Sequence, residues 1–339
     1  MTDSHSAIER SLHQSIARLN ELTESYADLR NRYRELIRHV EGRDLEYEEH
    51  LKNALQQSTQ SQVSRNRDSG IEVYVTVSHD LGATAAVAAR VFESYVLEAE
   101  RESVSIGISG GRTIAGMMEC VKGEYDDRLQ LVPLSGSRLP KDVRISVNTI
   151  IGRFCSQRGR ETVSGLQLPL DPRMRKGIPD KTYEELFESE LRSYYLYLDG
   201  EGRREQERHG LPVHYAFTGV GSLDATSAVP RMRELLRIST SCPREVVGDM
   251  LDWPIDANGK VVDYAGVQQA IVGIRPDQLI EGYAKGNLKK IVVVAGAGGL
   301  RDRLKDEAIC AAWRGGLFDV LVTDRTTAEA IIERLRMQT

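Results

Sequence analysis

The segment Gly107–Thr113 has the residue types of an anion-binding loop, since it reads Gly-Ile-Ser-Gly-Gly-Arg-Thr. Glycines let a backbone turn sharply and bring its N–H groups close to a ligand. Hydroxyl groups and a guanidinium add donors and charge that suit a phosphate. The segment is neither a Walker A loop nor a full dinucleotide fingerprint. We interpret it as an anion cradle, and the alternative is a structural turn with Arg112 in solvent. The candidate ligand-binding residues of this loop are Gly107, Ser109, Gly110, Gly111, Arg112 and Thr113.

The elements on either side of this loop favour the cradle. The pattern predicts a strand over 104–108 and a helix that opens at Ile114. The N-terminus of a helix carries unsatisfied N–H donors and a partial positive charge, both of which attract an anion.

Further glycine loops follow other predicted strands, and they add candidate residues to the same site. In a doubly wound sheet the carboxyl ends of the strands meet at one edge, where ligands bind. Lys305 comes shortly after one of these loops, where it either reaches a phosphate or is an exposed helix lysine. The candidates that these loops add outside the first loop are Gly219, Gly221, Asp224, Gly296 and Lys305.

After a predicted strand at 71–77, short apolar runs alternate with helical patterns from residue 80 onwards, which predicts a doubly wound, mostly parallel α/β sheet. The helical pattern over 83–99 is one of the connections, and Thr326 or Thr327 is expected to cap the last helix. Residues 135–212 carry the weakest pattern and include a basic stretch at 169–176. The predicted strands cover 71–77, 104–108, 129–134, 213–218, 289–295 and 319–323.

The N-terminal part of the chain has a different spacing of apolar residues. Residues 8–40 contain no Pro or Gly, and their apolar residues recur in a heptad pattern. A narrow heptad stripe suits a partner helix and favours an intermolecular coiled coil, whereas the alternative is one amphipathic helix on its own domain. The sequence thus predicts a helical coiled-coil arm over 1–57, a polar linker over 58–70 and an α/β domain over 71–339. The arm is expected to form a homo-oligomer through residues 8–40.

Composition and charge exclude several classes of protein. The formal net charge is −5, so a nucleic-acid contact would need a local basic patch. The N-terminus is polar and no apolar run is long enough to span a membrane, which indicates a cytoplasmic protein. Cys120, Cys155, Cys242 and Cys310 lie far apart, so the sequence predicts no metal site and no disulfide framework, and no cofactor is expected.

Four motifs, taken in order, resemble the sugar-binding effector domain of the SorC (DeoR/SorC-type) family of bacterial transcription regulators. They are GISGGRTIAGMM at 107–118, FTGVGSLDATS at 217–227, VVGDMLDWPIDANGKVV at 246–262, and the stretch 292–332. The resemblance covers residues from about 80 to 335 and is strongest after residue 215. Two features depart from the family pattern. No helix-turn-helix is recognisable, and Gly110 stands where the family loop usually has tryptophan.

The resemblance implies a fold related to phosphosugar isomerases, with a phosphorylated sugar at the carboxyl ends of the strands. The loop Gly107–Thr113 would take the phosphate, Asp249 would lie near the sugar, and Lys305 would approach the phosphate or a hydroxyl. Gly219, Gly221 and Gly296 would let the backbone come close to the ligand.

Three functions are compatible with these residues. The first is a non-catalytic sensor of a phosphorylated sugar or other anionic small molecule, with DNA binding or partner recruitment left open as its output. The second is a phosphosugar isomerase or nucleoside hydrolase, for which Asp224, Asp249 and Asp252 are candidate acids. The third is a partner-binding scaffold without a ligand. We interpret His214, at the start of a predicted strand, as a structural residue.

Overall fold

The computed structural model describes the α/β body of the chain. The described residues are 43–58, 70–98, 103–123, 129–135, 140–157, 213–223, 243–262, 274–284, 288–297 and 305–337. The predicted coiled coil at 8–40 and the basic stretch at 169–176 lie outside these residues.

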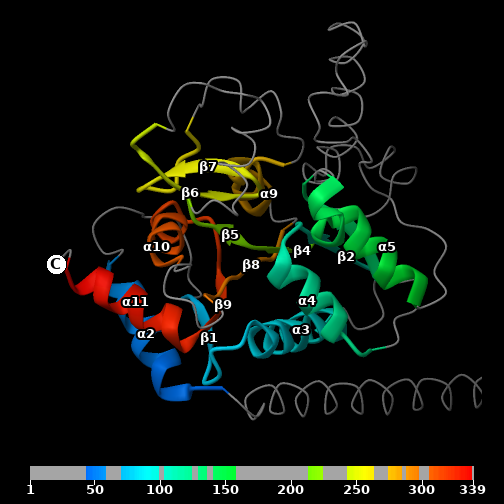
Figure 1. Cartoon of the computed structure of the whole chain (residues 1–339), viewed down its shortest axis with the longest axis horizontal. Helices are drawn as coiled ribbons and strands as arrows, with labels where there is room; N and C mark the ends of the chain where they lie inside the picture. Colours follow the sequence, from blue (N-terminus) through cyan, green and yellow to red (C-terminus); the bar gives the residue numbers. More distant parts are fainter. Residues whose placement is uncertain are drawn as a thin grey trace, which may run out of the picture.

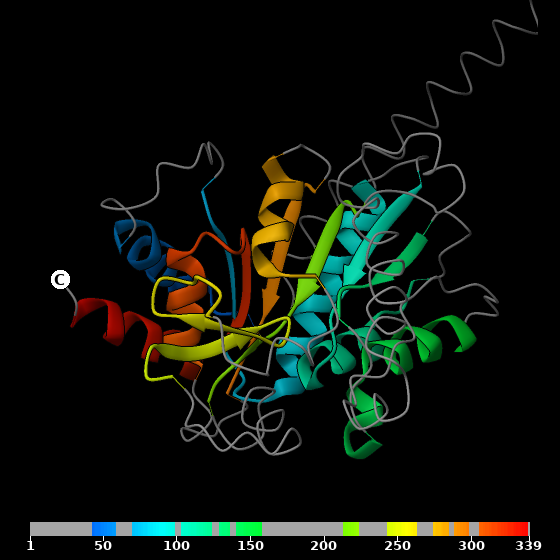
Figure 2. The ribbon, with the colours of Figure 1, turned by 90° about the horizontal axis from the view of Figure 1, so that it is seen from above.

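A parallel sheet of six strands forms the centre of the body (Figures 1 and 2). Every neighbouring pair in it is parallel, in the order β1-β9-β8-β4-β2-β3. The predicted α/β class is therefore confirmed, and each of the six predicted strands is present. These strands are β1 (Glu72–Thr76), β2 (Val104–Ile108), β3 (Leu129–Pro133), β4 (Tyr215–Thr218), β8 (Lys290–Val294) and β9 (Val320–Asp324). Four are shorter than predicted, β2 has the predicted bounds, and β9 is shifted by one residue.

Helices cover both faces of this sheet, and each face has its own hydrophobic core. One core joins α3 (Leu81–Glu98), α4 (Arg112–Cys120) and α5 (Val147–Gln157), preceded by the short 3-10 helix η1 (Pro140–Ile145), to one set of strand side chains. The other core lies under α2 (Leu45–Ser58), α9 (Pro276–Ala284), α10 (Asp306–Arg314) and α11 (Arg325–Arg336). Successive side chains of the buried strands point alternately into the two cores, because helices cover both faces of the sheet.

A second, antiparallel sheet stands at the carboxyl edge of the large one, and the sequence analysis did not predict it. It has three strands in the order β5-β6-β7, with bounds β5 (Val220–Gly221), β6 (Val246–Met250) and β7 (Trp253–Asp256). Figure 1 shows β6 and β7 beside α10, and Gly248 allows this contact because a Cβ there would lie 2.4 Å from the Cβ of Ala308. This sheet places new side chains over the strand ends.

Helix α2 packs on the body although its residues fall within the predicted arm. Leu51 and Leu55 are fully buried in the same core as α10 and α11. The indole nitrogen of Trp313 donates to the carbonyl oxygen of Leu55 at 2.9 Å. Residues 45–58 are thus part of the folded α/β unit, which the predicted boundary at residue 71 leaves out.

Two local predictions are wrong. The predicted first strand extends to Val77, but β1 ends at Thr76 and Val77 is 47% exposed. The last helix is capped by Asp324 rather than by a threonine, since its carboxylate accepts from the Thr327 backbone N–H at 2.8 Å. Asp is a strong N-cap residue, and here it is also the last residue of β9.

Candidate functional site

One pocket lies at the carboxyl edge of the large sheet, between the strand ends and the small antiparallel sheet. Apart from Gly107, each predicted site residue that the structure describes lines it. These residues are Ser109, Gly110, Gly111, Arg112, Thr113, Gly219, Gly221, Asp249, Gly296 and Lys305. Asp224 lies outside the described residues. The pocket thus brings together residues from four separate parts of the sequence.

Gly107 has a different role from the one predicted. It lies inside β2, and a Cβ at this position would come within 2.5 Å of the Leu134 side chain. Gly107 is therefore a packing glycine below the pocket and not a part of the loop that lines it.

Gly111 is the N-cap residue of α4 and gives the loop its shape. Its φ of 127° and ψ of 160° belong to a backbone region that only glycine adopts readily. Because the N-cap residue is a glycine, it provides no side chain to cap this helix end. Helix geometry leaves the N–H groups of a first turn without carbonyl partners inside the helix, and here that turn holds Thr113 and Ile114. The open end of α4 faces the pocket with the positive end of its dipole.

The backbone N–H groups earlier in the loop are used internally. Gly111 N donates to Ile145 O at 2.9 Å, and Gly110 N makes a longer contact of 3.4 Å with the Ser135 hydroxyl. Ser109 N donates to Phe217 O at 3.0 Å. The donors for an anion are therefore those of the first turn of α4, whereas the sequence analysis assigned them to the whole loop.

Asp249 enters the pocket from the small sheet. It is opposite Gly221 in the β5–β6 ladder and its side chain is buried. A Cβ on Gly221 would lie 2.2 Å from Asp249 Oδ2, so the absence of a side chain at 221 makes room for the carboxylate. The buried position of the Asp249 carboxylate therefore requires a glycine at residue 221.

Gly296 and Lys305 close the far side of the pocket. A Cβ on Gly296 would lie 2.4 Å from Asp324 Oδ2, the carboxylate that caps α11. The next residue, Ala297, donates its N–H to the Thr327 hydroxyl at 3.0 Å. Lys305 is at the N-cap position of α10 and lines the pocket. The wall formed by Gly296 and Ala297 is thus bonded directly to the start of α11.

The sequence analysis missed several lining residues. Thr218 ends one predicted strand and Ser135 directly follows another, and this position was a usable signal because strand carboxyl ends meet at one edge. Leu251 and Asp252 form the turn between β6 and β7, and Asp252 was considered only as a catalytic acid. The other missed lining residues are Leu81, Ile114, Ile145, Val220, Ser222 and Ala297.

Two groups with potential chemistry outside the pocket have structural roles. Ser105 N donates to His214 Nδ1 at 3.1 Å, which ties the ring to β2 and agrees with the interpretation of His214 as a structural residue. Burial raises the pKa of the Cys310 thiol to about 12, so it stays protonated at neutral pH. Within the described ranges no helix is long and apolar enough to cross a membrane, and no cluster of three or more metal-binding side chains occurs.

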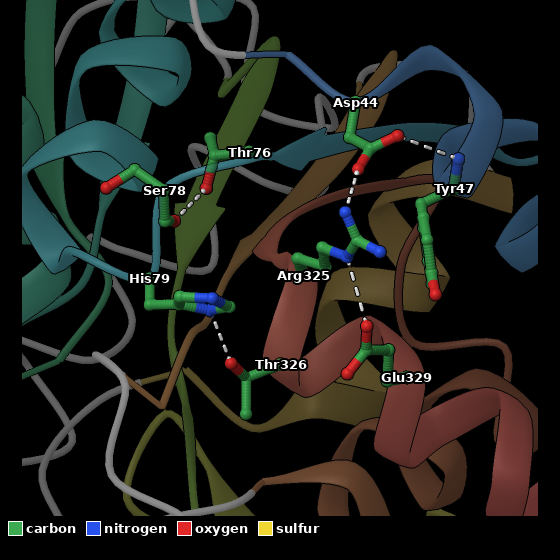
Figure 3. Close-up of polar contacts among 8 residues, drawn as sticks. All are labelled: Asp44, Tyr47, Thr76, Ser78, His79, Arg325, Thr326 and Glu329. Atoms are coloured by element: carbon green, nitrogen blue, oxygen red, sulfur yellow. Dashed lines mark hydrogen bonds and ion pairs between the residues drawn. The ribbon is translucent and has the colours of Figure 1, made fainter.

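The chain enters the body next to the first residue of α11, as Figure 3 shows. The guanidinium of Arg325 forms an ion pair with Asp44 at 3.4 Å and a second with Glu329 at 3.0 Å. It also lies 4.3 Å from the centre of the Tyr47 ring. Asp44 N donates to Val75 O at 2.8 Å, so residues 43 and 44 cover the outer edge of β1. Beside this junction, the His79 ring nitrogen is 2.6 Å from the Thr326 hydroxyl.

The chain is similar to a family of sugar-binding domains and to transcriptional regulators. Residues 211–333 match the family model described as "Putative sugar-binding domain". The transcriptional regulator LsrR of Escherichia coli K12 is 37% identical over 86 residues, which is 25% of this chain and 24% of that regulator. The curated relatives are thus matched over about a quarter of their length.

Solved structures of the same kind share the fold. The full-length sorbitol operon regulator SorC from Klebsiella pneumoniae has a TM-score of 0.57 and 21% identity, over 84% of this chain and 81% of that one. The probable sor operon regulator from Shigella flexneri has a TM-score of 0.56 and 20% identity, over 84% and 99% of the two chains. These findings confirm the resemblance to SorC-type sugar-binding domains.

Proposed function

We propose that this chain, whose body has the fold of SorC-type sugar-binding regulators, is a non-catalytic sensor of a phosphorylated sugar or a similar anionic small molecule. One observation carries the proposal, namely that the open N-terminus of α4 and the buried Asp249 carboxylate line the same pocket. A helix N-terminus suits a phosphate, and a carboxylate accepts hydrogen bonds from sugar hydroxyls.

The cations of the pocket support an anionic ligand. Arg112 begins α4, and Lys305 lies at the N-cap position of α10. A contact between a charged group and a phosphate contributes about 1.5–3 kcal/mol. Together with Thr113, these residues supply the charge and the hydroxyl that the cradle needs. The proposed function places the protein in the cytoplasm.

A continuous set of contacts runs from the pocket to the base of the predicted arm, which suits a sensor. The wall at Ala297 bonds to Thr327 in the first turn of α11. Arg325, at the start of the same helix, holds Asp44 and Tyr47 at the point where the chain enters the body. A ligand that shifts the pocket wall would therefore act on the helix that anchors the arm.

The function is tested with the purified full-length protein. Small molecules released from it are identified by mass spectrometry, and calorimetry measures binding of inorganic phosphate, glucose 6-phosphate and fructose 6-phosphate. We expect micromolar binding of at least one sugar phosphate. Phosphorus NMR of the mixture separates a sensor from an enzyme, because a sensor returns the sugar phosphate unchanged. A protein that binds none of these and releases no anionic molecule is not the proposed sensor, and the scaffold function would then be preferred.

The arm is proposed to join copies of the chain through its heptad pattern. Leu22→Lys with Leu29→Lys places two charges in the predicted seam, so we expect a lower mass by light scattering. Ala17→Lys with Asn31→Lys adds the same charge at heptad positions away from the seam and is the matched control. If both double variants keep the full-length mass, the coiled-coil prediction is wrong. Deletion of residues 1–42 is a suitable truncation because it spares α2, which belongs to the core.

A further inference from the structure

The turn between β6 and β7 has an unusual backbone for its residues. It consists of Leu251 and Asp252, with Met250 and Trp253 paired at the ends of the strands. Both turn residues have left-handed backbones, with φ values of 56° and 70°. A two-residue hairpin loop with two positive φ values is normally built from Asn-Gly or Asp-Gly, because a Cβ disfavours this region. A leucine followed by an aspartate therefore makes the backbone conformation of this turn less favourable than Asn-Gly or Asp-Gly would.

Both side chains of this turn are buried and line the ligand pocket. Leu251 is 3% exposed and Asp252 is 4% exposed. The strands beside them are fixed by the core, since Met250 and Trp253 are buried and the Arg275 guanidinium lies 5.0 Å from the centre of the Trp253 ring. Unfavourable backbone conformations that the surroundings enforce are concentrated at functional sites. Glycine would form this turn more easily but would place no side chain in the pocket. The turn instead holds the side chains of Leu251 and Asp252 there.

The turn and the anion cradle belong to different elements. The open end of α4 and Arg112 approach the pocket from the large sheet, whereas Asp249, Leu251 and Asp252 come from the small one. The pocket therefore has a wall of N–H donors and a wall with two carboxylates and one apolar side chain. A phosphate fits the first wall and is repelled by the second.

We propose that Asp252 is a specificity-determining residue that reads the hydroxyl groups of the sugar at the end away from the phosphate. Leu251 packs against the C–H face of the same sugar. The pocket thus selects the monophosphate of a neutral sugar and rejects ligands with a second anionic group, such as a sugar bisphosphate or a phosphorylated sugar acid. This inference rests on the proposed function and goes further, because it names the ligand class.

The test compares full-length wild type with Asp252→Asn and Asp252→Gly by calorimetry. The probes are inorganic phosphate, glucose 6-phosphate, fructose 6-phosphate, fructose 1,6-bisphosphate and 6-phosphogluconate. Asparagine tolerates the left-handed backbone and removes only the charge. We expect Asp252→Asn to weaken binding of the preferred monophosphate about 10-fold, to reduce its preference over the doubly anionic probes, and to leave inorganic phosphate unchanged.

Asp252→Gly gives a readout that does not depend on the ligand. Glycine adopts the left-handed backbone without cost, so this variant is expected to raise Tm by roughly 2–4 °C while it loses monophosphate affinity. Asp256→Asn is the matched control, because this carboxylate lies on the same hairpin, does not line the pocket, and accepts from the N–H groups of Asn258 and Lys260. Its ligand preferences should equal those of wild type.

The outcomes separate the two proposals. If wild type binds a sugar monophosphate and Asp252→Asn keeps the same affinities and preferences, the role of Asp252 is refuted while the sensor function stands. A lower Tm for Asp252→Gly would likewise show that the aspartate serves the fold and not the ligand. If wild type binds none of the probes, the sensor function itself fails and the inference falls with it.

Discussion

The variant Gly111→Asp is expected to lose more than about 100-fold in affinity for sugar phosphates and for inorganic phosphate, a change of about 2.7 kcal/mol. Gly111 is the N-cap of α4, and a Cβ there would meet no described atom within 4 Å. The new carboxylate would therefore stand in open space at the end of the helix. An aspartate at an N-cap accepts hydrogen bonds from the first-turn N–H groups. It would occupy the donors that the phosphate needs and repel the phosphate as well.

Two further substitutions at Gly111 separate charge from backbone strain. Gly111→Asn has nearly the shape of the aspartate and the same strain, with φ at 127°, but no charge. Gly111→Ala adds only the strain and a methyl group. Calorimetry should rank affinity as wild type, then Ala, then Asn, then Asp, while the thermal stability of the three variants falls by similar amounts. Equal affinity for the Asp and Asn variants would mean that the anion binds elsewhere, for example at the basic stretch 169–176.

The large sheet could be predicted from the sequence because its strands are short buried runs, each recognisable on its own. The small sheet could not, since β5 has two residues and pairs with a strand more than 20 positions away. Asp249 was therefore located only through the resemblance to a family, and the geometry that places it over Gly221 needed the structure. Non-local pairing of short strands leaves little periodicity in a sequence.

Glycines show most clearly why the site was predicted only in part. Gly107 and Gly111 occur in the same loop motif, yet one avoids a clash with Leu134 and the other adopts a backbone closed to other residues. A sequence does not distinguish these two reasons for glycine, because both depend on neighbours and dihedral angles. Helix α2 is a similar case. Its few apolar residues resemble a charged arm, and only Trp313 and the core around Leu51 show that it belongs to the body.

Substitution by alanine is expected to have different effects at Gly219 and Gly221. The loss of stability and of ligand affinity at Gly221 should be second only to the effect of Gly111→Asp. In Gly221→Ala the new methyl group would lie 2.2 Å from Asp249 Oδ2 and 2.7 Å from its Cγ. The carboxylate is buried and lines the pocket, so it must rotate away from residue 221 to make room for the methyl group. Overpacking of this kind costs about 1–3 kcal/mol of folding free energy. The displaced carboxylate would also leave the sugar wall of the pocket, so affinity for sugar phosphates should fall about 10-fold or more.

Gly219→Ala is the matched control for this prediction, two residues earlier in the same loop. A Cβ there has Val294 O as its nearest neighbour, at an ordinary contact distance of 3.7 Å. Its backbone does not have a positive φ. Alanine should therefore be tolerated, with a free energy of unfolding equal to that of wild type or about 0.4–1 kcal/mol higher, since it restricts the unfolded chain.

Urea unfolding measures the stability of both variants, and calorimetry with inorganic phosphate and glucose 6-phosphate measures ligand binding. Inorganic phosphate should bind Gly221→Ala normally, because the end of α4 is untouched. If Gly219→Ala and Gly221→Ala lose the same stability, the contact between Gly221 and Asp249 does not set the position of the carboxylate.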